Sequence, residues 1–438
     1  MDEMTATLLA IGLVFVLLAT GVPVFASLAL AGVAGVVMVE DLDFALNRLK
    51  AFSYTQTAVY LLTVIPLFIL MGNFAQKAGV GQRLFSVARK WVGQLPGGLA
   101  IASVLTSAGF AATSGSSVAT AATVGAVAIP EMKQAGYDRR LSTGAVAAGG
   151  VLGVLIPPSV LLIFYAALTE VSAGAMLVAG VLPGLLSTLV FIAGIVVVSK
   201  KIMPGRHQTQ PRYGWGERFA SLGDAWQVIV LFVVVLGGIY LGFVTPTEAG
   251  AIGAFAAFLM LLCSRQARAN LGDNLKDSFR SSISTTVMIL MTMLGAGIFS
   301  YFLTLVGAPQ YIVEAVTTVD LPPLLIIGLL LLIYLPLGMF LDAFSMLVIT
   351  LPILFPTVQS LGFDPLWFGI LAVKMCEIGL ITPPVGLNVY VTAGIDRDTP
   401  LVDVFRGAGW FMIMEAVTTL LIFFFPVIVT WLPANMLG

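Results

Sequence analysis

The stretch Gly153-Val154-Leu155-Ile156-Pro157-Pro158 recurs as Gly379-Leu380-Ile381-Thr382-Pro383-Pro384, 226 positions further along the chain (383 − 157). Both stretches interrupt apolar runs of sequence. Adjacent prolines remove amide donors and disfavour helix at the residue before them. Each stretch therefore predicts an apolar helix that is broken part-way along its length.

The duplication extends beyond the two proline pairs. Further matches occur at the same separation (364 − 138), and two more lie upstream at a separation of 223 (246 − 23). The matched segments are Ile129-Pro130 with Phe355-Pro356, Gly136-Tyr137-Asp138 with Gly362-Phe363-Asp364, Pro23 with Pro246, and Gly72 with Gly295. Collinear matches over most of a chain indicate two structural copies.

The composition places these copies in a membrane. Of 438 residues, 59% are hydrophobic and 10% are charged, which is far from the balance of a water-soluble domain. The charges separate apolar stretches of about 20 residues, the length with which a helix crosses a lipid bilayer. A net charge of -1 argues against a nucleic-acid partner. The sequence has no Walker loop, Cys/His cluster or Ser/His/Asp motif, so we expect neither an enzyme nor an ATP-driven pump.

We therefore expect an all-α polytopic membrane protein. Helical spans are predicted at about 5–20, 22–39, 57–75, 142–168, 173–199, 226–243, 245–263, 283–305, 367–395 and 407–433. Two longer apolar regions, about 92–130 and 322–358, are broken near the middle, and each predicts a re-entrant helical hairpin. The predicted division is a first repeat at 1–199, a cytoplasmic linker at 200–225 and a second repeat at 226–438.

The basic residues predict that the two hairpins open to opposite sides of the membrane, because Lys and Arg mark cytoplasmic loops. The first hairpin is flanked by Lys77, Arg83, Arg89, Lys90, Lys133, Arg139 and Arg140, whereas the flanks of the second carry no basic residue. Two copies of opposite orientation form an inverted-topology repeat, which is typical of secondary transporters.

The hairpin centres are the first candidate binding positions. The first carries Thr113-Ser114-Gly115-Ser116-Ser117, and small hydroxyl residues allow a sharp turn and offer oxygen ligands to a hard cation. Asp342 of the second hairpin aligns with Ser116 at the same separation of 226 (342 − 116). A carboxylate at membrane depth is usually paired or functional. Close helix packing through small residues, and a shallow Asp342 in contact with water, are the alternatives.

The two breaks are the second set of candidates. Backbone carbonyls freed around Gly153 to Ile156 and around Gly379 to Thr382 can coordinate Na+, and the helix that follows can face an anion. Predicted Na+ ligands are Ser114, Ser116, Gly153, Ile156, Asp342, Gly379 and Thr382, and predicted substrate contacts are Ser116, Ser117, Pro158, Thr382 and Asn388. A structural kink without a ligand is the competing interpretation. Lys374 and Glu377, three residues apart, are expected to share a helix face as an ion pair with a structural or gating role.

At these residues the sequence resembles the large membrane subunit of the TRAP family, the tripartite ATP-independent periplasmic transporters. The matching stretches are Ile65 to Gly72, Ser114 to Ser117, Gly153 to Pro158, Thr245 to Gly250 and Glu377 to Gly386. The resemblance implies Na+-driven uptake of a carboxylate across a bacterial or archaeal inner membrane by an elevator movement. It also implies a periplasmic substrate-binding protein and a small four-helix membrane subunit as partners.

Because no N-terminal extension supplies a fused small subunit, that partner is expected to be a separate chain. A binding-protein-independent carboxylate carrier is one alternative, and a channel or non-transporting membrane scaffold is another. The sequence does not identify the carboxylate.

Overall fold

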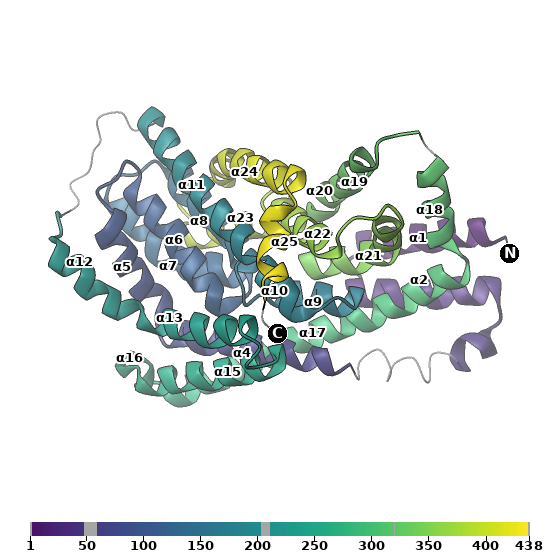
Figure 1. Cartoon of the computed structure of the whole chain (residues 1–438), viewed down its shortest axis with the longest axis horizontal. Helices are drawn as coiled ribbons and strands as arrows, with labels where there is room; N and C mark the ends of the chain where they lie inside the picture. The colour runs from purple at the N-terminus through teal and green to yellow at the C-terminus, as the bar shows by residue number, and fades with distance from the viewer. Residues whose placement is uncertain (1, 48–58, 203–210, 319, 437–438) are drawn as a thin grey trace.

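A computed structural model describes residues 2–47, 59–202, 211–318 and 320–436, and these residues form helices without any strand. The helices of the first half are α1 (Glu3–Ala19), α2 (Val24–Val39), η1 (Tyr60–Thr63), α4 (Val64–Lys77), α5 (Val80–Val92), α6 (Gly98–Ser114), α7 (Ser117–Gln134), α8 (Arg139–Leu155), α9 (Val160–Thr169), α10 (Ala173–Ala179) and α11 (Val181–Ile202). The predicted all-α fold is confirmed for the described part of the chain (Figure 1).

The second half begins with several short helical segments and ends with longer ones. They are α12 (Trp215–Leu222), η2 (Gly223–Ala225), α13 (Trp226–Phe232), η3 (Val233–Gly237), α14 (Gly238–Tyr240), α15 (Pro246–Cys263), α16 (Arg265–Arg268), α17 (Leu271–Leu305), α18 (Ala308–Thr318), α19 (Pro323–Leu332), α20 (Tyr334–Gly338), α21 (Ala343–Ser360), α22 (Pro365–Gly379), α23 (Leu387–Ile395), α24 (Leu401–Phe424) and α25 (Val427–Ala434).

The lengths of the helices confirm a polytopic membrane protein. Among the described residues, seven helices are long and apolar enough to cross a bilayer, and α8 with α9, bent by 44°, makes an eighth if counted as one span. The predicted spans at 5–20 and 22–39 correspond to α1 and α2, which have 17 and 16 residues and are shorter than these seven. The start of the span predicted at 57–75 lies outside the described residues.

Several predicted spans differ in extent from the helices that form, among them the spans at 283–305 and 407–433. The span at 283–305 belongs to α17, which has 35 residues because its helix already begins at Leu271, within a polar segment. The span at 407–433 is divided into α24 and α25, since Pro426 interrupts the helix after Phe425. The predicted linker at 200–225 contains α12, and residues 203–210 within it are not described.

Each region predicted as a hairpin forms helices joined by a turn. The region 92–130 corresponds to α6 and α7, which are joined by Gly115 and Ser116. The region 322–358 corresponds to α19, α20 and α21, with a turn between Gly338 and Ala343. The insertion of these hairpins into a membrane, and the division of the chain into inverted repeats, stay predictions.

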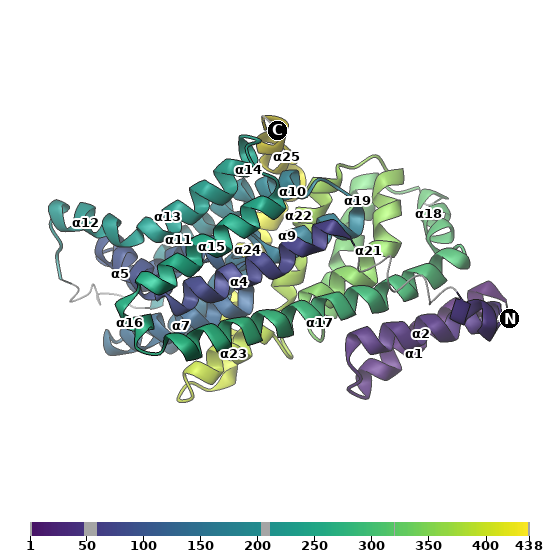
Figure 2. The ribbon, with the colours of Figure 1, turned by 90° about the horizontal axis from the view of Figure 1, so that it is seen from below.

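Helix α17, with 35 residues, lies along one side of the molecule. It runs along the long axis beside α4 and α15 (Figure 2) and packs against α2. A Cβ atom on Gly295 of α17 would lie 2.2 Å from the Phe25 carbonyl oxygen of α2, and one on Gly32 would lie 2.8 Å from the Phe299 amide nitrogen. Small residues allow this close approach, as is usual between membrane helices. Helices α8 and α24 meet in the same way at Gly144 and Gly407.

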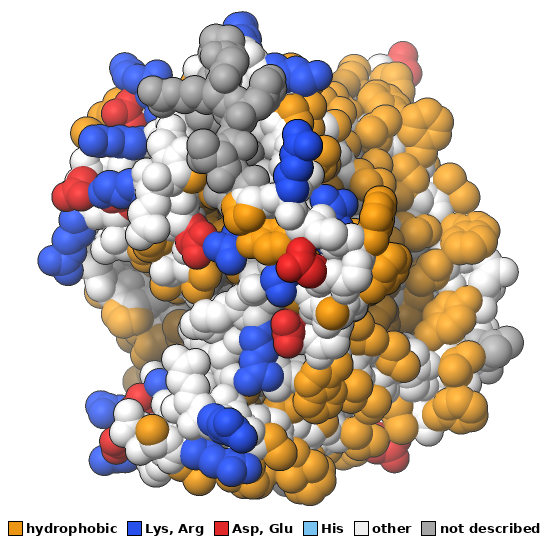
Figure 3. All heavy atoms as spheres, turned by 90° about the vertical axis from the view of Figure 1, so that its left-hand side faces the viewer, with side chains coloured by type: hydrophobic (Ala, Val, Ile, Leu, Met, Phe, Trp, Pro, Cys, Tyr) orange, Lys and Arg blue, Asp and Glu red, His pale blue; other side chains and the backbone are white. Residues whose placement is uncertain are grey.

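Basic side chains are a feature of one end of the molecule. Lys and Arg are numerous at the end where α5, α12 and α16 lie, whereas much of the remaining surface in that view is hydrophobic (Figure 3). An apolar surface with charge at one end agrees with a helix bundle that faces lipid along its sides.

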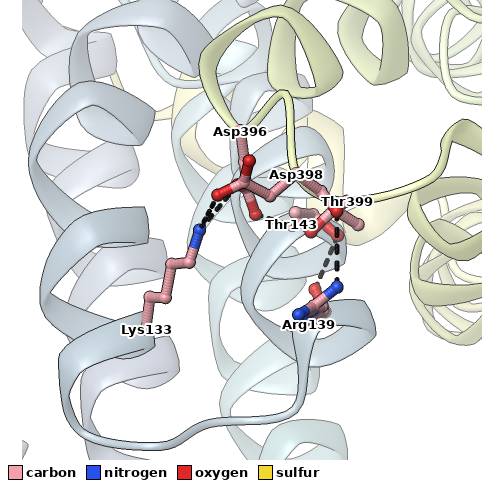
Figure 4. A network of polar contacts seen from close by, with 6 residues as sticks. All are labelled: Lys133, Arg139, Thr143, Asp396, Asp398 and Thr399. Carbon is pink, nitrogen blue, oxygen red and sulfur yellow. Dashed lines mark hydrogen bonds and ion pairs between the residues drawn. The ribbon is translucent and has the colours of Figure 1, made fainter.

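A polar network joins the turn between α7 and α8 to the loop that follows α23 (Figure 4). Lys133 Nζ donates to Asp396 at 3.3 Å and also bonds to Asp398, and Arg139 donates to the Asp398 carbonyl oxygen at 3.3 Å. The bond to Asp398 raises the pKa of the Lys133 ammonium above its ordinary value and lowers the pKa of the Asp398 carboxyl. The network therefore links segments that are 263 residues apart in sequence.

Candidate functional site

A cavity of about 330 Å³ lies between the two hairpins and helices α4 and α17. Its wall includes the turn between α6 and α7, the first residues of α21 and the last residues of α22. Both predicted hairpin tips therefore border one space, although they are more than two hundred residues apart in sequence (342 − 116 = 226).

The first tip is a two-residue turn that exposes hydroxyl groups to the cavity. Gly115 has a φ of +59°, a left-handed conformation that glycine adopts without strain. Ser116 caps α7 by accepting a hydrogen bond from the Ala119 amide at 3.4 Å, and the Ser114 hydroxyl bonds to that of Thr120 at 2.8 Å. Ser114, Ser116 and Ser117 line the cavity.

The second tip presents the carboxylate of Asp342 to the same cavity. Oδ1 of Asp342 accepts hydrogen bonds from the amides of Phe344 at 3.0 Å and Ser345 at 3.1 Å, and Oδ2 accepts one from the Ser345 hydroxyl. Asp342 is thus the N-cap of α21, where the helix dipole also favours negative charge. Its charge is stabilised within its own hairpin.

The break between α8 and α9 lies directly behind the first tip. A Cβ atom on Gly153 would lie 2.9 Å from the Ser116 carbonyl oxygen, and one on Gly115 would lie 3.0 Å from the Pro158 carbonyl oxygen. Only glycine permits such approaches without displacement of the backbone. The sequence Gly153 to Pro158 therefore supports the turn that carries the hydroxyl groups.

The break between α22 and α23 lies close to the second hairpin. A Cβ atom on Gly379 would lie 2.6 Å from the Gly338 Cα atom of α20. The Thr382 hydroxyl donates to the Ile378 carbonyl oxygen at 2.7 Å, so this carbonyl oxygen already has a hydrogen-bond partner. Asn388 of α23 is fully buried, and neither polar atom of its side chain has a hydrogen-bond partner among the described residues.

The structure thus brings four predicted residues into one cavity and places the others outside its lining. Ser114, Ser116, Ser117 and Asp342 line the cavity, whereas Gly153, Ile156, Pro158, Gly379, Thr382 and Asn388 do not. Their neighbours Val154, Leu380 and Leu387 do line it, so both breaks adjoin the cavity. The roles of all these residues in binding Na+ or substrate stay predictions.

Sequence reasoning missed the polar residues on the opposite wall. Asn73 of α4 donates to Ser282 of α17 at 2.8 Å, and Gln76 donates to Thr123 of α7 at 2.7 Å. Asn73 and Gln76 line the cavity together with Ser281 and Thr285. Two amide side chains within an otherwise apolar span were the signal that could have identified this wall.

The predicted pair of Lys374 and Glu377 is wrong. Lys374 Nζ bonds to Glu415 of α24 and to Ser187 of α11 at 3.0 Å. Its side chain therefore points toward α11 and α24, whereas Glu377 on the same helix faces the cavity. The spacing allowed a shared face, but the packing of α22 among its neighbours separates the two charges.

The polar groups that the two hairpin tips bring to the cavity are oxygen atoms. The hairpin tips offer hydroxyl and carboxylate oxygens, which are ligands for hard cations. The part of the chain that the structure describes contains no group of three His, Cys, Asp or Glu side chains placed to hold a metal ion. The binding of Na+ in this cavity stays a prediction.

These helices and this cavity define a polytopic membrane protein with a polar cavity between two helical hairpins. Residues 11–429 match the family model described as "Tripartite ATP-independent periplasmic transporter, DctM component". The chain is also 39% identical over 414 residues to the C4-dicarboxylate TRAP transporter large permease protein DctM of Pseudomonas aeruginosa, covering 93% of this chain and 92% of that protein. The chain therefore belongs to the DctM component of the TRAP transporters, as the resemblance in its sequence indicated.

Two further likenesses agree with this assignment. The C4-dicarboxylate TRAP transporter large permease protein DctM of Vibrio cholerae is 34% identical over 453 residues, with 98% of this chain and 99% of that protein covered. The crystal structure of the YdaH transporter of Alcanivorax borkumensis superposes with a TM-score of 0.63 at 15% identity, covering 96% of this chain and 98% of that chain. The likeness to YdaH concerns the fold alone. The relatives are permeases, which is consistent with the expectation that this chain is not an enzyme.

Proposed function

We propose that this chain is the transporting subunit of a Na+-coupled, binding-protein-dependent carrier that imports a C4-dicarboxylate. One observation carries the proposal: the hydroxyl-lined tip at Ser114 to Ser117 and the carboxylate-bearing tip at Asp342 border the same cavity. Oxygen ligands for Na+ and space for a small anion are then adjacent.

Bound Na+ would create the positive potential that a dicarboxylate requires. Among the residues that line the cavity there is no Lys or Arg, while Asp342 and Glu377 are acidic. An anion is therefore repelled until cations neutralise the carboxylates. This order of binding would couple substrate uptake to the Na+ gradient, because the anion binds well only when Na+ is present.

The choice of a C4-dicarboxylate rests on the two DctM relatives, which carry that substrate in their names. We further propose the partners that this family implies, namely a small four-helix membrane subunit and a periplasmic substrate-binding protein. The complex would lie in a bacterial inner membrane.

An elevator movement is the proposed mechanism. The cavity has one wall of hairpin tips and α22, and an opposite wall formed by α4 and α17. Sliding of the first wall along the second would carry the bound ions and substrate across the membrane while the tips stay together. The hydrogen bond from Gln76 of α4 to Thr123 of α7 bridges the two sides, so it would have to exchange during that movement. The bond from Asn73 to Ser282 lies within the wall of α4 and α17 and could stay intact.

The test uses the complete complex in proteoliposomes, with a binding protein loaded with a radiolabelled C4-dicarboxylate. Uptake is expected to follow an inward Na+ gradient and to be indifferent to ATP. Undiminished uptake in Na+-free buffer at constant pH would overturn the proposal and favour a proton-coupled carrier. Uptake without the binding protein would instead indicate an independent carrier.

A further inference from the structure

Glu377 is an ionisable side chain of the cavity without a hydrogen-bond partner. It lies in the last turn of α22, its exposed fraction is 1%, and it lines the cavity beside Ser117 and Asp342. Neither of its carboxylate oxygens completes a hydrogen bond with any described residue. The Ser117 side chain interacts with this carboxylate but does not complete such a bond.

The charged neighbours of Glu377 are already committed to other partners. Lys374, one turn earlier on α22, is paired with Glu415 of α24. Asp342 of α21 is held by two backbone amides and the Ser345 hydroxyl. Two buried tyrosines on helices that pack against α22 also have partners: the Tyr334 hydroxyl of α20 is bonded to Thr350, and the Tyr165 hydroxyl of α9 donates to the Pro365 carbonyl oxygen. The Cys376 thiol, next to Glu377 in sequence, is a buried free thiol.

An unpaired carboxylate in such surroundings is unfavourable. Removing an ion from water is strongly unfavourable unless a counter-charge and hydrogen bonds replace the lost hydration. Asp342 and the pair of Lys374 with Glu415 have such partners, whereas Glu377 has none among the described residues. A buried carboxyl without partners is neutralised either by a proton or by a bound cation. The cavity that Glu377 lines gives a cation access to it.

We propose that the Glu377 carboxylate is an additional ligand for a Na+ ion inside this cavity, with the Ser117 hydroxyl as the neighbouring oxygen donor. This position is distinct from the predicted carbonyl ligands at Gly153 to Ile156 and Gly379 to Thr382. It deepens the proposed function and rests on it, because it assumes that Na+ enters the cavity. The ion at Glu377 would also face the space available to the substrate.

Binding of Na+ to the purified chain tests this assignment without measurement of transport. Thermal unfolding is followed in detergent with NaCl, and choline chloride replaces NaCl at equal ionic strength in the reference series. Glu377→Gln keeps the size of the side chain and removes its charge, whereas Glu377→Asp keeps the charge. Glu248→Gln on α15, outside the cavity, is the matched control, since its amide oxygen can still accept the cap bonds from Thr245.

For the E377Q variant, the Na+ concentration that gives half of the maximal rise in the unfolding temperature is expected to be about tenfold higher than for the wild type. Alternatively, one Na+-dependent step in this rise is expected to be lost. E377D is expected to retain the step with weaker apparent affinity, and E248Q to match the wild type. If E377Q does not purify as a folded protein, an E377D response identical to that of the wild type would overturn the assignment.

The failures of the two proposals are distinguishable. A wild-type chain that responds to Na+ while E377Q responds equally would overturn the role of Glu377 and leave Na+ coupling intact. The same holds if E377Q alters only the pH dependence, because Glu377 would then carry a proton. A wild-type chain without any Na+ response would overturn the proposed coupling, and the role of Glu377 with it.

Discussion

Lys374 of α22 and Glu415 of α24 form an ion pair whose side chains are both fully buried. The pair also contacts α11, because Lys374 donates to the Ser187 hydroxyl of that helix. The Thr418 hydroxyl donates to the Glu415 carboxylate at 3.1 Å. Three helices are therefore joined at one point beside the cavity. Burial of an ion pair gives little net stability, but removal of one partner leaves the other as an uncompensated charge.

Replacement of Lys374 by Met is expected to destabilise the protein strongly, by about 3 to 5 kcal/mol, because Glu415 would stay buried without its counter-charge. The double variant K374M/E415M is expected to recover most of this loss, since it removes both charges. Fluorescence-detected gel filtration after heating measures the two midpoints. A double variant that is less stable than K374M alone would contradict this explanation.

The link between Lys133 and Asp398 is expected to be insensitive to pH over a wide range. The pKa of Asp398 is lowered from 3.8, so its contribution is lost only as the pH falls through that lower value. The pKa of Lys133 is raised from 10.5, so its contribution is lost only as the pH rises through that higher value. Both groups therefore stay charged between these limits.

Lys133→Gln tests this expectation when its thermal midpoint is compared with that of the wild type at several pH values. The difference is expected to be small and constant from about pH 5 to about pH 9. High salt is expected to reduce it, because the lysine is exposed and its interactions are screened. A difference that disappears near neutral pH would show that another group controls the link.

Labelling of single cysteines tests the predicted orientation of the two hairpins. Gln134 follows the first hairpin and Ser360 ends the second, and both residues are exposed. With Cys263 and Cys376 replaced by Ala, an impermeant thiol reagent added to intact cells is expected to label S360C and to spare Q134C. Both positions should react after the membrane is permeabilised. Equal labelling of the two in intact cells would rule out opposite orientations.

Much of the helical framework could be predicted because it depends on local properties of the sequence. Apolar length and the Pro-Pro motifs identified α8 with α9 and α22 with α23 as broken helices. The alignment of Asp342 with Ser116 identified both tips, since equivalent positions of two copies occupy equivalent places. These inferences needed no knowledge of how distant helices pack.

The partner of Lys374 could not be predicted for the opposite reason. A spacing of three on one helix made Glu377 a plausible partner, but the choice depends on the rotation of α22 relative to α11 and α24. Glu415 is 41 residues away, and nothing in its local sequence indicates that contact. The amides of Asn73 and Gln76 in an apolar helix were a local signal, but their place in the cavity wall depends on how α4 and α17 pack against the first tip.

Asp342→Asn is expected to weaken Na+ activation and dicarboxylate uptake together, by about tenfold or more in apparent Na+ affinity. The variant removes the charge that faces the cavity, but asparagine remains a good N-cap, so α21 should stay folded. Asp342→Ala removes both the charge and the cap. A comparison of the thermal midpoints and the Na+ dependence of the two variants separates loss of the ligand from loss of the helix start.

Ser116→Val provides the corresponding change at the first tip. It removes the hydroxyl that caps α7 and adds bulk beside Gly153, where the backbones approach closely. Because the two tips border one cavity, S116V and D342N are both expected to reduce Na+ activation, although they lie on different hairpins. Uptake by proteoliposomes over a range of Na+ concentrations measures both. If both variants transported with the Na+ dependence of the wild type, the hairpin tips would be structural and the ions would bind elsewhere.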